Sequence, residues 1–98
     1  MEKKYELTNE TMEHDGHTLY RIRALTNIPR IFVKKGDLGG WVEFEKNLSQ
    51  EENAWVYGNA QVYGNAQVGD DARVYGNAQV CNDVQVCGNT RVCDGAIY

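Results

Sequence analysis

The chain has 98 residues, enough for one small domain with a single hydrophobic core. Its 14 acidic and 10 basic residues give a net charge of −4, which argues against direct binding of nucleic acid, because such proteins concentrate basic residues on one face. No apolar run is long enough to cross a membrane, and the start of the sequence lacks the apolar core of a signal peptide. The sequence therefore predicts a soluble, cytoplasmic protein with no membrane partner.

The first third of the chain is predicted to form a β-hairpin. The runs KYELTNETMEH and HTLYRIRAL are rich in β-formers and flank Asp15-Gly16, a dipeptide typical of two-residue hairpin turns. The rest of the chain is a repeat, and a stack of repeated strands exposes apolar core and unpaired backbone at each end. We therefore expect residues 1–37 to be an N-terminal cap and a lead-in to the repeat.

From residue 38 onward the sequence repeats every six residues. In the frame of Val56, hexads run without insertion from LGGWVE (38–43) to VCDGAI (92–97). Position 5 of one hexad and position 1 of the next are apolar and two residues apart, so they share one face of a short strand. Gly and Asn or Asp at positions 3 and 4 suit a corner. Each hexad is one strand and one corner, and such strands bury a core only by stacking into a β-solenoid.

The hexad frame predicts which side chains face the core. Position 1 is mostly Val and position 5 is mostly Ala, as expected where several walls meet in a narrow interior. Gln50 is the polar exception, and we expect it at a distortion near the first coil. The predicted inward residues at position 1 are Leu38, Phe44, Gln50, Val56, Val62, Val68, Val74, Val80, Val86 and Val92. Those at position 5 are Val42, Leu48, Ala54, Ala60, Ala66, Ala72, Ala78, Val84, Thr90 and Ala96.

These hexads, with a small residue two before an aliphatic one, resemble the bacterial hexapeptide-repeat family. The resemblance covers residues 38–98, and the segment GDLGGWVEFEKNLSQEENAWVYGNAQVYGNAQV is also similar to small phage and prophage proteins labelled as transferases for the repeat alone. It implies a left-handed β-helix with three hexads, or eighteen residues, per coil. The expected fold is therefore all-β, with a hairpin cap over 1–37 and a β-helix of about three coils over 38–98.

Coils of eighteen residues would align outward side chains in columns. Tyr57 and Tyr75 would share one column, with Tyr63 on the next wall. A second column would hold Trp55, Arg73 and Arg91. Tyr, Trp and Arg are enriched at binding hot spots, so these six residues are the candidate binding surface. The alternative is that they only stack on one another, with Arg over Trp as a cation–π pair.

The cysteines and histidines are the candidates for metal binding or catalysis, and neither group is expected to supply it. Six-residue spacing places Cys81, Cys87 and Cys93 on different walls, too far apart for a disulfide or a thiolate metal site. His14 and His17 flank the hairpin turn, which is expected to splay their rings into solvent. We therefore predict no catalytic residue, no metal and no cofactor.

The expected function is that of a non-enzymatic binding module. The acyltransferases of the family use a His as general base, and residues 38–98 contain none. The resemblance to prophage proteins implies an accessory factor that binds and modulates a host protein, for example a defence component, in a bacterial cytoplasm. One alternative is an acyltransferase-like enzyme with His14 or His17 of a neighbouring subunit as the base. Another is an oligomer that sequesters a small nucleotide-type ligand, with phosphate meeting Arg21, Arg23, Arg73 or Arg91.

The C-terminal end of the repeat carries no segment comparable to the hairpin. Ile97 and Tyr98 are expected to lie at the open end of the last coil, where apolar core and unpaired strands would be exposed. We therefore predict a homo-oligomer. An end-to-end dimer through this end is the first choice, and a face-packed trimer is the second.

Overall fold

The computed structural model describes residues 3–93 and 95–97, without the side chain of Ile97. These residues form strands and two short 3-10 helices, η1 (Pro29–Ile31) and η2 (Glu45–Asn47), so the prediction of an all-β fold is confirmed. Within the described ranges, no helix has the length and apolar character needed to span a membrane. The strands are β1 (Tyr5–His14), β2 (His17–Ala24), β3 (Leu38–Val42), β4 (Trp55–Val56), β5 (Gln61–Val62), β6 (Gln67–Val68), β7 (Arg73–Tyr75), β8 (Gln79–Val80), β9 (Gln85–Val86), β10 (Arg91–Cys93) and β11 (Ala96–Ile97).

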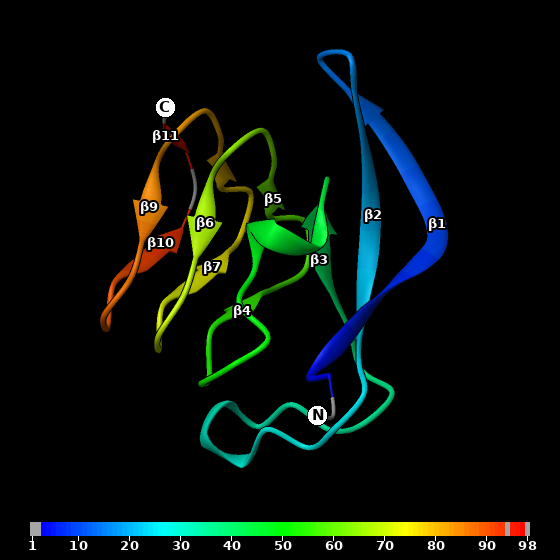
Figure 1. Cartoon of the computed structure of the whole chain (residues 1–98), viewed down its shortest axis with the longest axis vertical. Coiled ribbons are helices and arrows are strands. Elements are labelled where there is room, and N and C mark those ends of the chain that lie inside the picture. The colour runs from blue at the N-terminus through cyan, green and yellow to red at the C-terminus, as the bar shows by residue number, and fades with distance from the viewer. Residues whose placement is uncertain (1–2, 94, 98) are drawn as a thin grey trace.

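The N-terminal segment is a long β-hairpin, as predicted. β1 pairs antiparallel with β2, and His14 lies opposite His17 at the turn. Asp15 and Gly16 both have left-handed φ angles, 49° and 81°, as a type I′ turn requires and as Asp-Gly favours. β2 also pairs antiparallel with β3, so the hairpin extends the first sheet along one side of the molecule (Figure 1).

The short strands after β3 stack in parallel. Trp55 lies opposite Arg73, and Arg73 lies opposite Arg91, so successive partners are eighteen residues apart. The sheets have the strand orders β1-β2-β3-β5-β8-β11, β4-β7-β10 and β6-β9. Figure 1 shows β9, β10 and β11 on the side of the molecule away from the hairpin. Outward residues eighteen apart therefore align in columns, as predicted.

One hydrophobic core runs through the stack and into the hairpin. The predicted inward frame is confirmed over the middle of the repeat, where every Val from 56 to 80 and every Ala from 54 to 78 in that frame is at most 1% exposed. Towards the C-terminal end the frame loosens, since Val84 is half-buried and Thr90 and Ala96 are exposed. At the other end the same core includes residues of the non-repeating segment: Tyr5, Ile22, Ala24, Ile28, Ile31 and Val33.

The predicted hexad frame is wrong at its N-terminal end. Val42 pairs with Val62, and Leu48 bridges to Val68, so in both cases the partners are twenty residues apart. The next partners, starting from Val56, are again eighteen apart. Two extra residues therefore lie in the corner between Leu48 and Val56, where an uninterrupted run of hexads was expected.

This slip turns the first predicted position-1 residues outward, whereas the position-5 residues Val42 and Leu48 are buried as predicted. Leu38 and Phe44 are 53% and 46% exposed, and Gln50 is half-buried. Gln50 instead ties the longer corner to the N-terminal strand. Its side-chain oxygen accepts hydrogen bonds from the backbone N–H groups of Lys4 and Tyr5, at 2.8 and 3.2 Å, and its amide nitrogen donates to the carbonyl oxygen of Tyr5. The expected distortion at Gln50 is thus a contact between the corner and the N-terminal strand.

Asn47 joins the segment after β3 to the segment between β5 and β6. Its side chain is fully buried. The side-chain oxygen accepts hydrogen bonds from the N–H groups of Glu43 and Phe44, and the amide nitrogen donates to the carbonyl oxygens of Gly64 and Ala66. In the hexad frame Asn47 occupies a corner position, whereas here its side chain bonds four backbone groups. One of these, the N–H of Glu43, also donates to the carbonyl oxygen of Val62.

Candidate binding site

The candidate site lies on the outer face of the β4-β7-β10 sheet. Each of these strands points one valine into the core, so the residues on either side of that valine face outward. Four of the predicted surface residues, Tyr57, Arg73, Tyr75 and Arg91, line one open groove of about 320 Å³. We call it the tyrosine–arginine groove. Its volume lies at the lower limit of small-molecule sites.

Tyr57 and Tyr75 form the aromatic part of the groove. Their rings meet edge to face, with centroids 6.4 Å apart and an interplanar angle of 90°. Burial raises the pKa of the Tyr57 hydroxyl, although the charge of Arg73 acts in the opposite direction. A hydrogen bond with the Cys93 side chain raises the pKa of Tyr75. Both hydroxyls are therefore protonated at neutral pH; Tyr57 can donate a hydrogen bond to a ligand, whereas the single proton of the Tyr75 hydroxyl is shared with Cys93.

Arg73 and Arg91 supply the positive charge of the groove. They are direct partners in the parallel ladder, so their backbones are one strand spacing apart, about 4.8 Å. Like charges placed opposite one another destabilise a sheet. Over the described part of the chain, neither guanidinium forms an ion pair with a carboxylate, whereas Arg21 and Arg23 of the hairpin each pair with a glutamate. No carboxylate of the described residues is thus bound to the two groove arginines.

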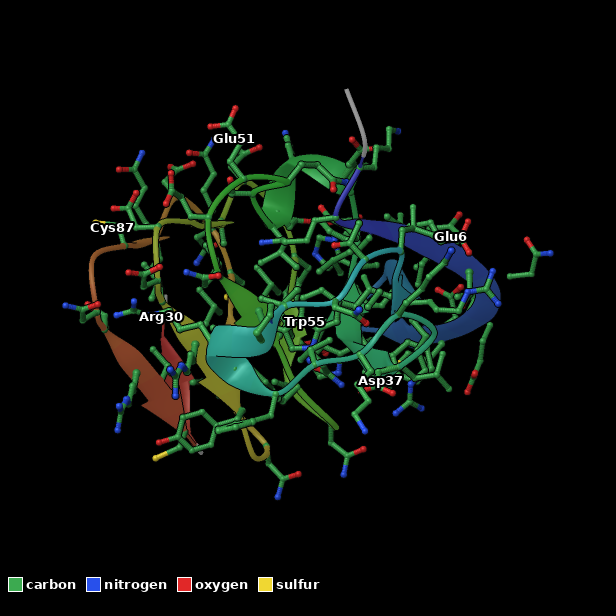
Figure 2. The ribbon with its side chains drawn as sticks, turned by 90° about the horizontal axis from the view of Figure 1, so that it is seen from below. Glu6, Arg30, Asp37, Glu51, Trp55 and Cys87 are labelled. Carbon is green, nitrogen blue, oxygen red and sulfur yellow. The ribbon has the colours of Figure 1, made fainter. Side chains whose placement is uncertain are left out.

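Two of the six predicted surface residues are buried, so the predicted surface is too large. Trp55 is 1% exposed, and its ring packs against that of Tyr5 with centroids 6.3 Å apart. Figure 2 shows Trp55 in the middle of the molecule. Tyr63 is 5% exposed, because the rings of His14 and His17 cover it at centroid distances of 5.4 and 4.9 Å. The aromatic partner of Trp55 is thus Tyr5, where the alternative interpretation had placed an arginine.

The histidines do not splay into solvent, and that prediction is wrong. His17 Nδ1 lies 2.9 Å from Oε2 of Glu43, whose other carboxylate oxygen accepts a hydrogen bond from the N–H of Gly64. His14 Nε2 is buried and has no hydrogen-bond partner in the described ranges. Those ranges also contain no group of three residues that could hold a metal ion. The arrangement fastens the hairpin tip to the outer face of the first sheet.

The three cysteines lie on three different sheets, as predicted. Cys81 follows β8, Cys87 follows β9, and Cys93 ends β10. Among the described residues none of the three forms a disulfide; Cys81 is buried, and the other two are exposed. Cys87 lies at the periphery in Figure 2, far from Trp55 in that view. Only Cys93 adjoins the tyrosine–arginine groove, through its hydrogen bond with Tyr75.

The predicted oligomer end is described in part. Tyr98 and the side chain of Ile97 lie outside the described residues. The backbone of β11 forms one edge of the largest sheet, and β9 and β10 are edge strands of the other two. These three strands lie on the same side of the molecule in Figure 1, so strand edges are gathered there.

Neither a protein-family model nor a curated protein matches the sequence. The groove joins two tyrosines and two arginines on a sheet with a well-packed core behind it. Such a surface can bind a partner through aromatic contacts and charge.

Proposed function

We propose that this chain is a non-enzymatic binding module that recognises a protein partner through the tyrosine–arginine groove. The observation that carries the proposal is the convergence of Tyr57, Arg73, Tyr75 and Arg91 on one exposed groove. Tyr and Arg are among the residue types that dominate binding energy at protein interfaces. The groove is open along the sheet, whereas small-molecule sites enclose most of their ligand. Its shape therefore suits a protein surface better than a small molecule.

The proposed scaffold is a small left-handed β-helix of about three coils. Support comes from the parallel partners eighteen residues apart on three sheets and from the buried Val and Ala positions. The handedness rests on the resemblance to hexapeptide-repeat proteins. Stacked strands hold their outward side chains in fixed columns, which lowers the conformational entropy lost on binding. The scaffold would thus preorganise the groove.

The proposed partner is a bacterial host protein, and the proposed role is that of a phage or prophage accessory factor acting in the cytoplasm. This part of the proposal rests on the resemblance of the repeat to small prophage proteins. His14 and His17, which an acyltransferase would need, pack on Tyr63 over a different sheet from the groove. They are therefore not placed to act on a ligand bound there.

We further propose that the chain forms an end-to-end homodimer through β9, β10 and β11, with a face-packed trimer as the second choice. Edge strands offer unpaired backbone groups to another chain. A dimer through these edges would leave the outer face of β4 and β7 accessible. Native mass spectrometry of the purified chain tests this, and a monomer alone would contradict it.

A second candidate function is the sequestration of a small nucleotide-type ligand. It is favoured by the absence of acidic partners for Arg73 and Arg91 among the described residues, since unpaired guanidinium groups are typical phosphate ligands. The open shape of the groove favours the protein partner, and we rank the small ligand second.

The binding function is tested by gentle capture of the tagged chain from bacterial lysate. We expect the wild type to retain one host protein and the Tyr57→Ser/Tyr75→Ser variant to lose it. The matched control is Gln67→Ser/Gln85→Ser, which changes two outward residues in the column of the β6-β9 sheet. Retention by the tyrosine variant, or equal loss from both variants, would contradict the assignment of the groove.

A further inference from the structure

We infer that the tyrosine–arginine groove binds an acidic segment of the partner protein, with a carboxylate held between Arg73 and Arg91. The inference rests on the proposed function and adds the chemistry of the partner.

The repeat is acidic, yet it brings two of its few cations together. Residues 38–98 contain 3 basic and 8 acidic residues. Two of the three basic residues are Arg73 and Arg91, which lie directly opposite each other on adjacent strands. Their repulsion has no compensating carboxylate among the described side chains, whereas hairpin arginines have glutamate partners. An external carboxylate between the two guanidinium groups would offset this repulsion and accept several hydrogen bonds.

The tyrosines complete the fit to an acidic side chain. Tyr57 and Tyr75 are half-buried and present both a ring and a protonated hydroxyl beside the arginines. The methylene groups of Glu or Asp would pack on the rings while the hydroxyl of Tyr57 donates to an oxyanion. Because the groove is open, each ion pair formed there is partly screened and contributes little alone. A segment with several acidic residues is therefore favoured over one isolated carboxylate.

The probe is a fluorescent hexaglutamate peptide, with hexaglutamine as the neutral control, titrated with the full chain at low salt and read by anisotropy. We expect the acidic peptide to bind and the neutral peptide not to bind. Arg73→Gln/Arg91→Gln should weaken binding about tenfold or more, since it removes both charged partners. The matched variant Lys34→Gln/Lys35→Gln removes two cations from an exposed loop and should change the affinity by no more than about twofold.

Both arginines point outward, so the double variant should keep its melting temperature or raise it slightly as the repulsion is removed. Should it fail to fold, Arg91→Gln alone, at an exposed position, gives the same test. Equal weakening by the arginine and lysine variants would overturn the inference, because bulk charge would then explain the binding. So would the absence of peptide binding, or tighter binding of AMP than of peptide with the same dependence on arginine, which would identify a small phosphorylated ligand.

The two proposals fail in different ways. If capture of the host protein depends on Tyr57 and Tyr75 while peptide binding does not depend on the arginines, the acidic segment is wrong and the binding module stands. If capture does not depend on the tyrosines either, both are wrong.

Discussion

The Lys4 Nζ donates a 2.7 Å hydrogen bond to the carbonyl oxygen of Ala54, a residue fifty positions further along the chain. It also donates to the carbonyl oxygens of Glu51 and Glu52, at 3.2 and 3.5 Å. These carbonyls belong to the corner between Leu48 and Val56, which holds the two extra residues. Since Lys4 is buried, its ammonium group serves as the donor that this corner needs.

Replacing Lys4 by Met should therefore destabilise the protein. The change leaves the carbonyl oxygens of Glu51 and Ala54 without their donor, which costs about 1–3 kcal/mol of unfolding free energy. Urea denaturation measures the loss. The control Lys3→Met removes an exposed ion pair with Glu45 and should cost at most about 1 kcal/mol. An unchanged midpoint for Lys4→Met would mean that water replaces the ammonium group.

Stability should depend on pH through two buried groups, Lys4 and Tyr5, whose pKa values are shifted in opposite directions. Burial lowers the pKa of Lys4 from 10.5 to about 8, partly offset by the charge of Glu52. Between these values the unfolded chain binds more protons than the folded one, so the free energy of unfolding rises with pH. Burial, with the charge of Glu45, raises the pKa of Tyr5 above its usual 10.0. Above that pH the folded chain keeps a proton that the unfolded chain loses, and stability falls.

The urea concentration at the unfolding midpoint, measured from neutral to alkaline pH, should therefore pass through a maximum at about pH 10. The rise should be absent from Lys4→Met, and the fall should be smaller in Tyr5→Phe. A wild-type midpoint that declines steadily from neutral pH would contradict the sign assigned to Lys4.

The inward frame of the repeat can be tested on adjacent residues of β6. Val68 is 1% exposed, so Val68→Asp places an unpaired charge in the core and should cost on the order of 3–5 kcal/mol or unfold the chain. Gln67→Asp introduces the same side chain at an exposed position and should change stability by about 0.5 kcal/mol or less. Thermal unfolding followed by circular dichroism compares the two. Equal effects would show that the two residues do not face opposite sides.

Gly40 should tolerate no larger side chain. A Cβ added there would lie 2.6 Å from Val56 Cγ1 and 2.7 Å from the carbonyl oxygen of Ala60. Gly40→Ala should therefore cost about 1–3 kcal/mol through overpacking. Gly69→Ala is the matched control, because its Cβ would make only an ordinary 3.9 Å contact with Ser49. Gly69→Ala should leave the melting temperature unchanged or raise it slightly.

Most of the stack is predictable from the sequence because its signals are local. The Asp15-Gly16 dipeptide specifies its own turn, and a Val such as Val74 lies inward because the strand period fixes its face. The alignment of Arg73 with Arg91 follows once eighteen residues are taken as one turn. Four of the six candidate site residues could therefore be placed on one surface from the sequence alone.

The remaining features depend on contacts that the repeat does not encode. The extra residues near Gln50 are polar, as corner residues are, so the hexads can still be counted through them without a gap; only Gln50 at an inward position marks the site. Trp55 and Tyr63 are covered by Tyr5 and His14, and these come from a segment without periodicity. Burial of an outward residue by a non-repeating segment leaves no signal in the residue's own hexad.

The two-residue slip has a consequence for how the chain accepts mutations. Along most of the repeat, intolerant positions should recur every six residues, as at Val62, Val68 and Val74. Towards the N-terminus the recurrence should continue with the same interval but a shifted phase, at Leu48 and Val42. A saturation mutagenesis scan would thus show intolerant positions six residues apart, with one interval of eight residues between Leu48 and Val56. Alignments of related chains that force one uninterrupted period across this corner would pair core positions with surface positions.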